Sequence, residues 1–175
     1  MDYKVLNQKI KIAVPELAND LQILSVEDVV NLSQKDESLK QIYNFYWQYL
    51  SKPHKLLGRE GAVCPFIPLA LKFKKVHTIT IPNNSINEED VKTLMRLLLT
   101  TLDSLNEGKE ESTFVVFFTN KKIAADFVLK LQKDLKPEFV KQGFMIGEFF
   151  LGNSSPGLRN ANFFPLQSPI PALAV

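Results

Sequence analysis

The spacing of apolar residues changes twice along the chain and divides it into three stretches. In residues 1–24, short apolar runs alternate with polar residues, break at Pro15 and resume at Leu21, which predicts an extended arm docked on the rest of the protein. In residues 25–51, apolar side chains recur every three or four positions, the repeat of a helix with one buried face. A short helix is predicted to begin near Val26, after a capping box, and a second helix to cover about 36–51.

The third stretch, residues 52–175, alternates apolar runs of strand length with longer helical repeats. Its β-branched and aromatic runs predict strands at 76–81, 114–118 and 144–151. Because the second run is apolar throughout, it is predicted to be a central strand covered on both faces. Helices are predicted between the strands, from about Glu88 to Asn106 and from near Lys121 to Pro137, where the proline either kinks the helix or ends it. The sequence allows one further helical turn over 138–142.

Glycines and prolines recur through the last part of the chain. Residues 152–160 are predicted to form a loop, and three prolines in residues 165–175 predict irregular backbone or an edge strand. The order of elements is typical of an α+β protein, an α/β sandwich in which helices pack on a small mixed sheet after an N-terminal helical segment. We expect a single domain over 1–175, made of the arm at 1–24, the helical segment at 25–51 and the body at 52–175.

Composition excludes several classes of function. The chain has 21 basic and 19 acidic residues, and its basic residues are scattered, so no nucleic-acid partner is expected. No apolar run approaches the length that crosses a bilayer, so no membrane partner is expected either. A single cysteine forms no internal disulfide, which together with the lack of a signal-peptide pattern favours a cytoplasmic location.

Residues 53–68 concentrate residue types that are rare elsewhere in the chain. They include the one cysteine, Cys64, and one of the two histidines, His54. Glycines on both sides of Arg59 favour tight turns there, while prolines prevent a regular helix. Cys64 lies between a valine and a proline and is expected to be buried and structural, with a nucleophilic pair with His54 as the alternative. The sequence has no phosphate-binding loop, zinc motif or nucleophile elbow.

Three blocks of motifs run through the body. They are Pro53-His54 with Leu57-Gly58-Arg59 and Val63-Cys64-Pro65-Phe66, then Met145-Ile146-Gly147, and then Gly157-Leu158 with Phe164-Pro165-Leu166. Over roughly residues 50–175 these blocks resemble an uncharacterised bacterial domain family whose members lie beside natural-product biosynthesis genes. This resemblance implies no activity, because none is established for that family.

The layout is also similar, more distantly, to the YqcI/YcgG-type haem proteins, some of which are haem-dependent guanidine N-oxygenases. The similar features are a Cys/Pro/Phe block before the first strand, an apolar strand at 113–118 and the loop 153–159. Where those relatives carry a loop histidine, this chain has Gly157-Leu158. The resemblance therefore implies an iron ligand from elsewhere, and the candidates are His54 first, Cys64 second and His77 third.

The resemblance leads to a first hypothesis, a haem-dependent oxidative enzyme of the oxygenase or hydroxylase type. Its substrate is expected to be a small polar amino-acid-like metabolite of a biosynthetic pathway. Under this hypothesis His54 binds the iron, and Cys64, Phe66 and Trp47 surround the cofactor. Catalysis is assigned to two arginines that hold a carboxylate or a haem propionate, Arg59 and Arg159.

A second hypothesis is a non-catalytic binding or accessory domain in which the glycine- and proline-rich segment is structural. Each candidate has a structural alternative: His54 bonds across its own turn, the rings pack in a core, and the arginines pair with nearby glutamates. If the two loops around 58–65 and 152–160 meet at one end of the sheet, His54, Arg59 and Arg159 are expected to line one pocket. The expected partner is a small-molecule substrate, and a homodimer is left open.

Overall fold

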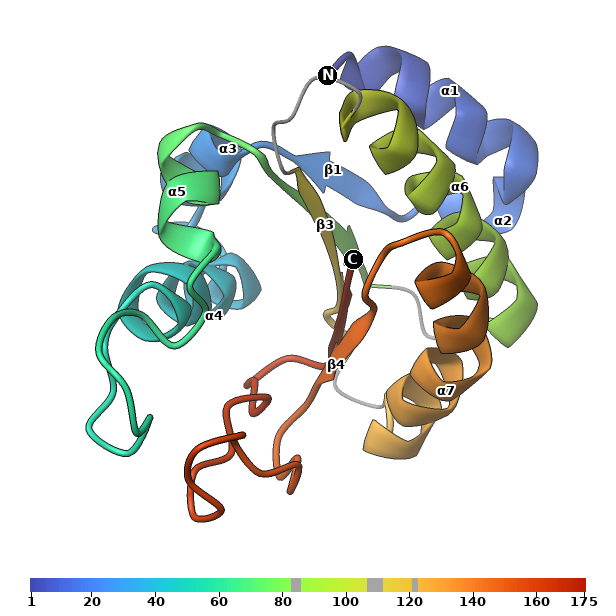
Figure 1. Ribbon diagram of the computed structural model, residues 1–175. Coiled ribbons are helices and arrows are strands. Elements are labelled where there is room, and N and C mark those ends of the chain that lie inside the picture. The colour runs from blue at the N-terminus through green and yellow to red at the C-terminus, as the bar shows by residue number, and fades with distance from the viewer. Residues whose placement is uncertain (83–85, 107–111, 121–122) are drawn as a thin grey trace.

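The computed structural model describes residues 1–82, 86–106, 112–120 and 123–175. A five-stranded sheet runs through the middle of the described chain in the order β1-β2-β3-β5-β4 (Figure 1). Its strands are β1 (Gln22–Leu24), β2 (Val76–Ile81), β3 (Thr113–Phe118), β4 (Gly147–Phe149) and β5 (Ala172–Ala174). The sheet is mixed, because β2 and β3 run parallel while the other neighbours run antiparallel.

Helices cover both faces of the sheet (Figure 1). One layer consists of α1 (Tyr3–Ala13), α2 (Pro15–Ala18), α6 (Glu88–Asn106) and α7 (Ala125–Lys141). The other consists of α3 (Val26–Leu32), α4 (Glu37–Asn44), the π-helix η1 (Phe45–Leu50) and α5 (Ile67–Lys72). The predicted fold class, α+β with a small mixed sheet, packed helices and an N-terminal helical segment, is therefore confirmed.

Side chains of β3 point alternately into two separate cores, as the pleat of a strand requires. Phe114, Val116 and Phe118 pack with the α1, α6 and α7 layer. Val115 and Phe117 pack with the α4, η1 and α5 layer. All five side chains are buried and β3 lies between β2 and β5, so the prediction of a central strand covered on both faces is confirmed.

The expectation of an extended arm over residues 1–24 is wrong for most of its length. Residues 3–13 form α1, whose N-terminus is capped by the Asp2 carboxylate accepting hydrogen bonds from the Lys4 and Val5 amides. Leu6 and Ile10 are buried four positions apart on one helical face against the core around α6. We interpreted Ile10, Ile12 and Val14 as the alternation of an extended chain, but the buried pair Leu6 and Ile10 follows the repeat of a helix. The strand in this stretch is β1, residues 22–24.

Three boundaries in the body also differ from the predictions. β4 covers 147–149 and not the whole of 144–151, and the last strand, β5, lies inside the sheet between β3 and β4 rather than at an edge. α7 continues through Pro137 to Lys141, so the proline does not end the helix, and the further turn that the sequence allowed after Pro137 belongs to the same helix. The predicted start of that helix near Lys121 lies outside the described residues, and the helix is described from Ala125.

The predicted helix over 36–51 is present, but its second half has the wider π geometry. The Ser51 amide donates to the Tyr46 carbonyl oxygen at 3.0 Å, a bond that spans five residues instead of four. π-Helical turns are rare and are frequently found at functional sites. The wider turn places residues of η1 in the walls of all three cavities described below.

Candidate functional site

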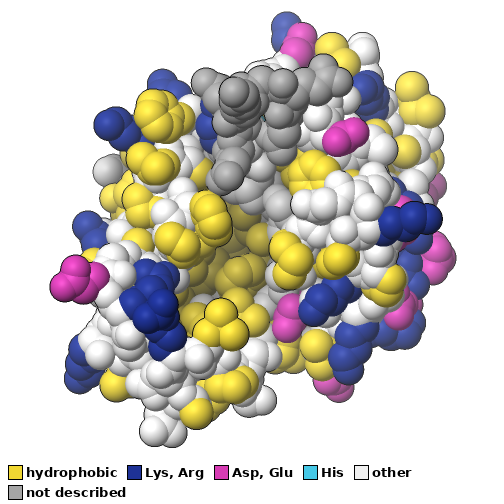
Figure 2. Space-filling view, in the orientation of Figure 1, with side chains coloured by type: hydrophobic (Ala, Val, Ile, Leu, Met, Phe, Trp, Pro, Cys, Tyr) yellow, Lys and Arg dark blue, Asp and Glu magenta, His cyan; other side chains and the backbone are white. Residues whose placement is uncertain are grey.

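The largest of these cavities, here called the central cavity, has a volume of about 860 Å³. It lies between the sheet and the layer of η1 and α5, and Figure 2 shows a hollow in the molecular surface with a mostly hydrophobic floor. η1, residues 63–67, α5, β4, β5 and the loop at 165–166 all contribute to its wall. Most of the lining side chains are apolar: Phe45, Tyr46, Leu50, Val63, Pro65, Phe66, Ile67, Leu69, Phe73, Val115, Phe149 and Leu166.

Packed aromatic rings form the inner wall of the central cavity. The ring of Phe45 meets the rings of Phe117 and Phe149 edge-on, at centroid distances of 6.2 and 5.6 Å. The hydroxyl groups of Tyr46 and Thr78 form a buried hydrogen bond of 3.1 Å behind this wall. Burial raises the pKa of Tyr46 well above its ordinary value, so its hydroxyl stays protonated and paired. The wall thus presents ring carbons rather than charge.

Polar groups line the central cavity at one end. Lys75, Ser112 and Thr113 stand at the amino ends of the parallel strands β2 and β3. The Thr113 hydroxyl is already engaged, because it donates to the Val175 carbonyl oxygen at 2.7 Å. A molecule in this cavity would therefore meet apolar side chains along most of its length and polar groups at one end.

Cys64 lines the central cavity and is partly exposed. We expected it to be buried because of its apolar neighbours, and that expectation is wrong. Its amide donates to the Leu50 carbonyl oxygen at 2.9 Å, which ties the backbone of the segment to the end of η1 and leaves the side chain at the cavity wall. Phe66 lines the same cavity and is largely exposed.

His54 lines a different cavity of about 770 Å³, here called the loop cavity, between α4, η1 and the loop around Phe163. Its ring stacks on the ring of Phe163 at 4.6 Å and 21°. Its Nδ1 accepts a hydrogen bond of 3.2 Å from the Leu56 amide, so the neutral ring carries its proton on Nε2. Most other polar lining residues are neutral amides: Gln41, Asn44, Gln48, Asn162 and Gln167.

The two predicted loops do meet. The Asn160 side-chain amide donates to the Leu56 carbonyl oxygen at 2.8 Å. Gly58 adopts a φ of +73°, and a Cβ atom at that position would lie 3.0 Å from the Cβ of Arg159, so the close approach requires glycine. The arginines nevertheless do not face a shared pocket with His54. Arg59 donates to the carbonyl oxygens of residues 60 and 63 in its own loop, at 2.9 and 3.0 Å, and neither arginine lines any of the three cavities.

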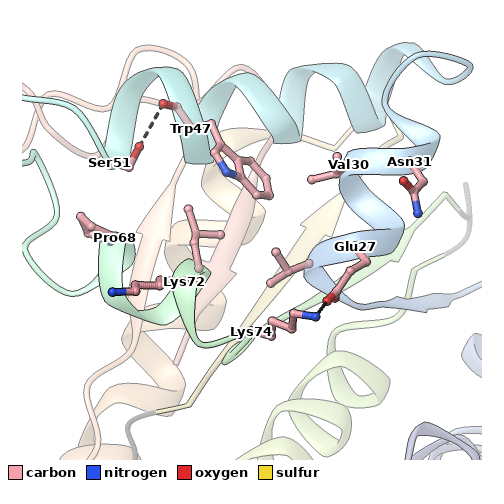
Figure 3. A pocket seen from close by; sticks show the side chains of 10 residues that line it. Glu27, Val30, Asn31, Trp47, Ser51, Pro68, Lys72 and Lys74 are labelled. Carbon is pink, nitrogen blue, oxygen red and sulfur yellow. Dashed lines mark hydrogen bonds and ion pairs between the residues drawn. The ribbon is translucent and has the colours of Figure 1, made fainter.

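Trp47 lines a third cavity of about 620 Å³ between η1, α3 and α5 (Figure 3). Its ring stacks on Tyr43 at 4.7 Å and 17°, and the ion pair between Lys74 and Glu27 closes the opposite side. Trp47, His54 and the pair Cys64 and Phe66 therefore belong to three separate cavities. All four residues were assigned to one cofactor site from the sequence, but the fold places them in three different cavities.

The three residues predicted as haem-iron ligands, His54, Cys64 and His77, do not form one haem site. A histidine that binds a metal through one ring nitrogen usually donates a hydrogen bond from the other, whereas Nδ1 of His54 accepts one. His77 is buried in the opposite core, where the Tyr3 hydroxyl lies 2.9 Å from its Nδ1. Cys64 is the one of the three that reaches the central cavity. Across the described ranges, no group of three or more His, Cys, Asp or Glu side chains is placed to hold a metal ion.

Sequence reasoning missed several residues of the central cavity. Phe45 and Phe149 are central to its wall but were not singled out, because neither lies in an unusual motif. One signal was available in the ring-rich face of the helix over 36–51, which we interpreted mainly as core packing. Tyr46 and Phe45 do pack in the core, and they also line the cavity.

The fold and the central cavity define a class of protein, an α+β domain with a ligand-sized apolar cavity on one face of its sheet. A comparison with family models matches residues 39–175 to the domain of unknown function DUF6875, and the chain belongs to that family. Neither the curated proteins nor the solved structures gave a match. None of the helices in the described ranges is long and apolar enough to span a bilayer.

Proposed function

We propose that this domain binds a mostly apolar small molecule in the central cavity. The observation that carries the proposal is the cavity itself: about 860 Å³ bounded by aromatic and aliphatic side chains, with polar groups gathered at one end. Small-molecule sites usually measure about 300–1,000 Å³ and combine an apolar wall with a few placed polar groups. A π-helix in the wall is a further feature typical of functional sites.

This proposal develops the second hypothesis of the sequence analysis, a binding or accessory domain. The first, a haem-dependent oxidative enzyme acting on a small polar amino-acid-like metabolite, stays a prediction based on the distant resemblance to YqcI/YcgG-type proteins. His54 and Trp47 lie outside the central cavity, and the arginines line none of the three cavities, so we assign no catalytic step to them. The proposed association with natural-product biosynthesis likewise stays a prediction.

Titration with Nile red, a neutral dye whose emission rises in apolar surroundings, tests the proposal. Ala174 lines the central cavity from β5 and is partly exposed, so Ala174→Leu fills space without removing a core side chain. We expect this variant to bind the dye clearly more weakly than the wild type. Ala161→Leu, at an exposed loop position outside the three cavities, is the matched control and should bind as the wild type does.

Cys64 supplies an independent reporter, because it is the one cysteine of the chain and lines the central cavity. A thiol reagent should label Cys64 in the native protein, and saturation with Nile red should slow that labelling. Equal labelling rates with and without bound dye, or equal dye affinity in the wild type and Ala174→Leu, would place the dye elsewhere and refute the proposed site.

The haem prediction has its own test. The wild type is titrated with haemin, and the Soret band is followed together with its response to Cys64→Ser and His54→Ala. A Soret shift lost only in Cys64→Ser would place haem in the central cavity. A shift lost in His54→Ala would support the ligand predicted from the sequence, and no shift at all would end the haem hypothesis.

A further inference from the structure

The short helix α5 exposes a row of large apolar side chains beside the mouth of the central cavity. Phe66, Leu69 and Phe73 are 64%, 59% and 61% exposed. They lie three and four positions apart, so they share one face of the helix and its flanking residues. All three also line the central cavity. We call this row the α5 stripe.

Isolated exposed apolar residues are common and need no partner, but a contiguous group of them marks an interaction surface. The α5 stripe differs in this way from other exposed apolar residues. It combines two phenylalanines and a leucine within about two helical turns, counting the residues that flank α5, whereas Met145, Leu151 and Leu158 stand in or beside separate turns of the C-terminal half.

The charged residues that flank the stripe along the chain are basic. From Gly61 to Pro82 the sequence contains three lysines and no acidic residue. Lys72 and Lys74 are exposed at the end of α5, and the ammonium of Lys72 lies 5.7 Å from the centroid of the Phe73 ring. Lys74 is paired with Glu27 of α3. In Figure 2, basic side chains stand around the hydrophobic patch on the side of α5.

We propose that the α5 stripe docks on the surface of an anionic lipid bilayer. Exposed aromatic and leucine side chains beside lysines are the composition of interfacial membrane-binding segments, in which the apolar groups enter the headgroup region and the cations meet anionic lipid. A second copy of the chain fits less well, because a two-fold contact through this face would place each lysine pair near its symmetry mate. The sequence predicted no membrane partner from the lack of a spanning run, and that argument does not concern surface contact.

The docking site would also place the central cavity against the lipid. Because the stripe residues line the cavity and are also more than half exposed, an apolar ligand would pass between bilayer and cavity without crossing bulk water. This part rests on the proposed function. The docking itself stands on exposure and charge, and its test uses no ligand.

Co-sedimentation of the full chain with vesicles tests the proposal. Vesicles of phosphatidylcholine alone are compared with vesicles that also contain phosphatidylglycerol, at low and high salt. We expect binding to the anionic vesicles that weakens with salt, and weak binding to the neutral ones. Trp47, the one tryptophan, lines a cavity with Pro68 and Leu71 of α5, so its emission is expected to change on binding.

Three variants separate the contributions. Phe66→Ser/Leu69→Ser/Phe73→Ser should abolish binding to anionic vesicles. The matched control Met145→Ser/Leu151→Ser/Leu158→Ser removes three exposed apolar side chains elsewhere and should bind as the wild type does. Lys72→Gln/Lys74→Gln should weaken binding roughly fivefold for each lysine. Circular dichroism establishes that each variant is folded, and because the substituted side chains are exposed, all are expected to fold.

Two outcomes would overturn the proposal. The first is a failure of the vesicle test: either the wild type does not bind anionic vesicles, or the stripe variant binds them as well as the wild type does. The other is a wild type that ignores vesicles but forms a dimer that the stripe variant loses in light scattering, which would make the stripe a contact between copies. Nile red binding is measured without vesicles, so a failed cavity and a failed docking surface give different results.

Discussion

Phe117 joins the sheet to the wall of the central cavity. Its side chain is fully buried in β3, and its ring meets the rings of Phe45 and Tyr46 of η1 at 6.2 and 5.8 Å. Removing this ring would leave an apolar hole behind the cavity wall and would take away two edge-on ring contacts. A single residue thus supports both the stability of the domain and the shape of the proposed site.

We expect Phe117→Ala to lower the free energy of unfolding by about 3–5 kcal/mol, measured by urea denaturation. Phe66→Ala is the matched control, because the same ring is removed from a side chain that is 64% exposed, and its effect should be within about 0.5 kcal/mol. Similar losses in the two variants would show that the ring of Phe117 is not a buried support of the fold.

The sequence predicts a site residue only where that residue is marked by its neighbours along the chain. Cys64 and Phe66 were chosen for their unusual neighbours, and both line the central cavity. His54 was chosen for its unusual neighbours and Trp47 for its place on the ring-rich face of the helix over 36–51. Both line other cavities, where His54 stacks on Phe163 and Trp47 stacks on Tyr43. A tight turn is visible in sequence, but the direction in which its side chains point is not.

Among the elements, α1 is where the sequence analysis failed most clearly. Val5 and Ile12 are exposed while Leu6 and Ile10 are buried, so the apolar residues of the helix do not all mark its inner face. Counted together, they resemble alternation. The helix becomes evident only when the buried pair is separated from the exposed pair, which requires knowing that α6 lies beside it.

Two isoleucines on α1 therefore test the helical register. Ile10 is fully buried and Ile12 is 84% exposed. We expect Ile10→Ala to cost about 2–5 kcal/mol of unfolding free energy. Ile12→Ala should change it little and should even favour the helix slightly, because alanine has the higher helix propensity. Equal losses of unfolding free energy in the two variants would show that residues 10 and 12 do not lie on opposite faces of a helix.

At the scale of the whole molecule, α1 is joined to the sheet through a buried polar pair. The Tyr3 hydroxyl lies 2.9 Å from Nδ1 of His77 on β2, and the ring of Phe114 packs beside the imidazole. Burial raises the pKa of Tyr3 to about 12, so the phenol remains protonated and donates to a neutral imidazole. This pair connects a helix outside the matched family region to strand β2 within it.

The pair predicts a pH dependence of stability. Burial first, then the positive charges of the N-terminus and Lys75, lower the pKa of His77 from 6.5 to about 4. Between these two pH values the folded state binds fewer protons than the unfolded state. The free energy of unfolding is therefore highest, with respect to His77, above about pH 6.5 and falls as the pH drops toward about 4.

Urea denaturation across this pH range measures the effect. His77→Gln, which cannot titrate, should reduce the slope of stability against pH. Tyr3→Phe removes the hydrogen bond and should lower stability at neutral pH while keeping most of the slope, since burial is the main cause of the pKa shift. A wild type whose stability is flat between these pH values would contradict the assignment.

The sequence by itself determined the features that depend on neighbours along the chain: the capped helix α3, the helix of α4 and η1, and the fully apolar strand β3. Periodicity and capping report local burial and local hydrogen bonds, and these suffice for elements and for the fold class. Only the tertiary structure decided that β5 enters the sheet between β3 and β4 and that α1 is a helix against α6. It also decided that Trp47, His54 and the pair Cys64 and Phe66 line three separate cavities, while the two arginines line none of them. These outcomes depend on which distant surfaces bury each other, and that information is distributed over the whole chain.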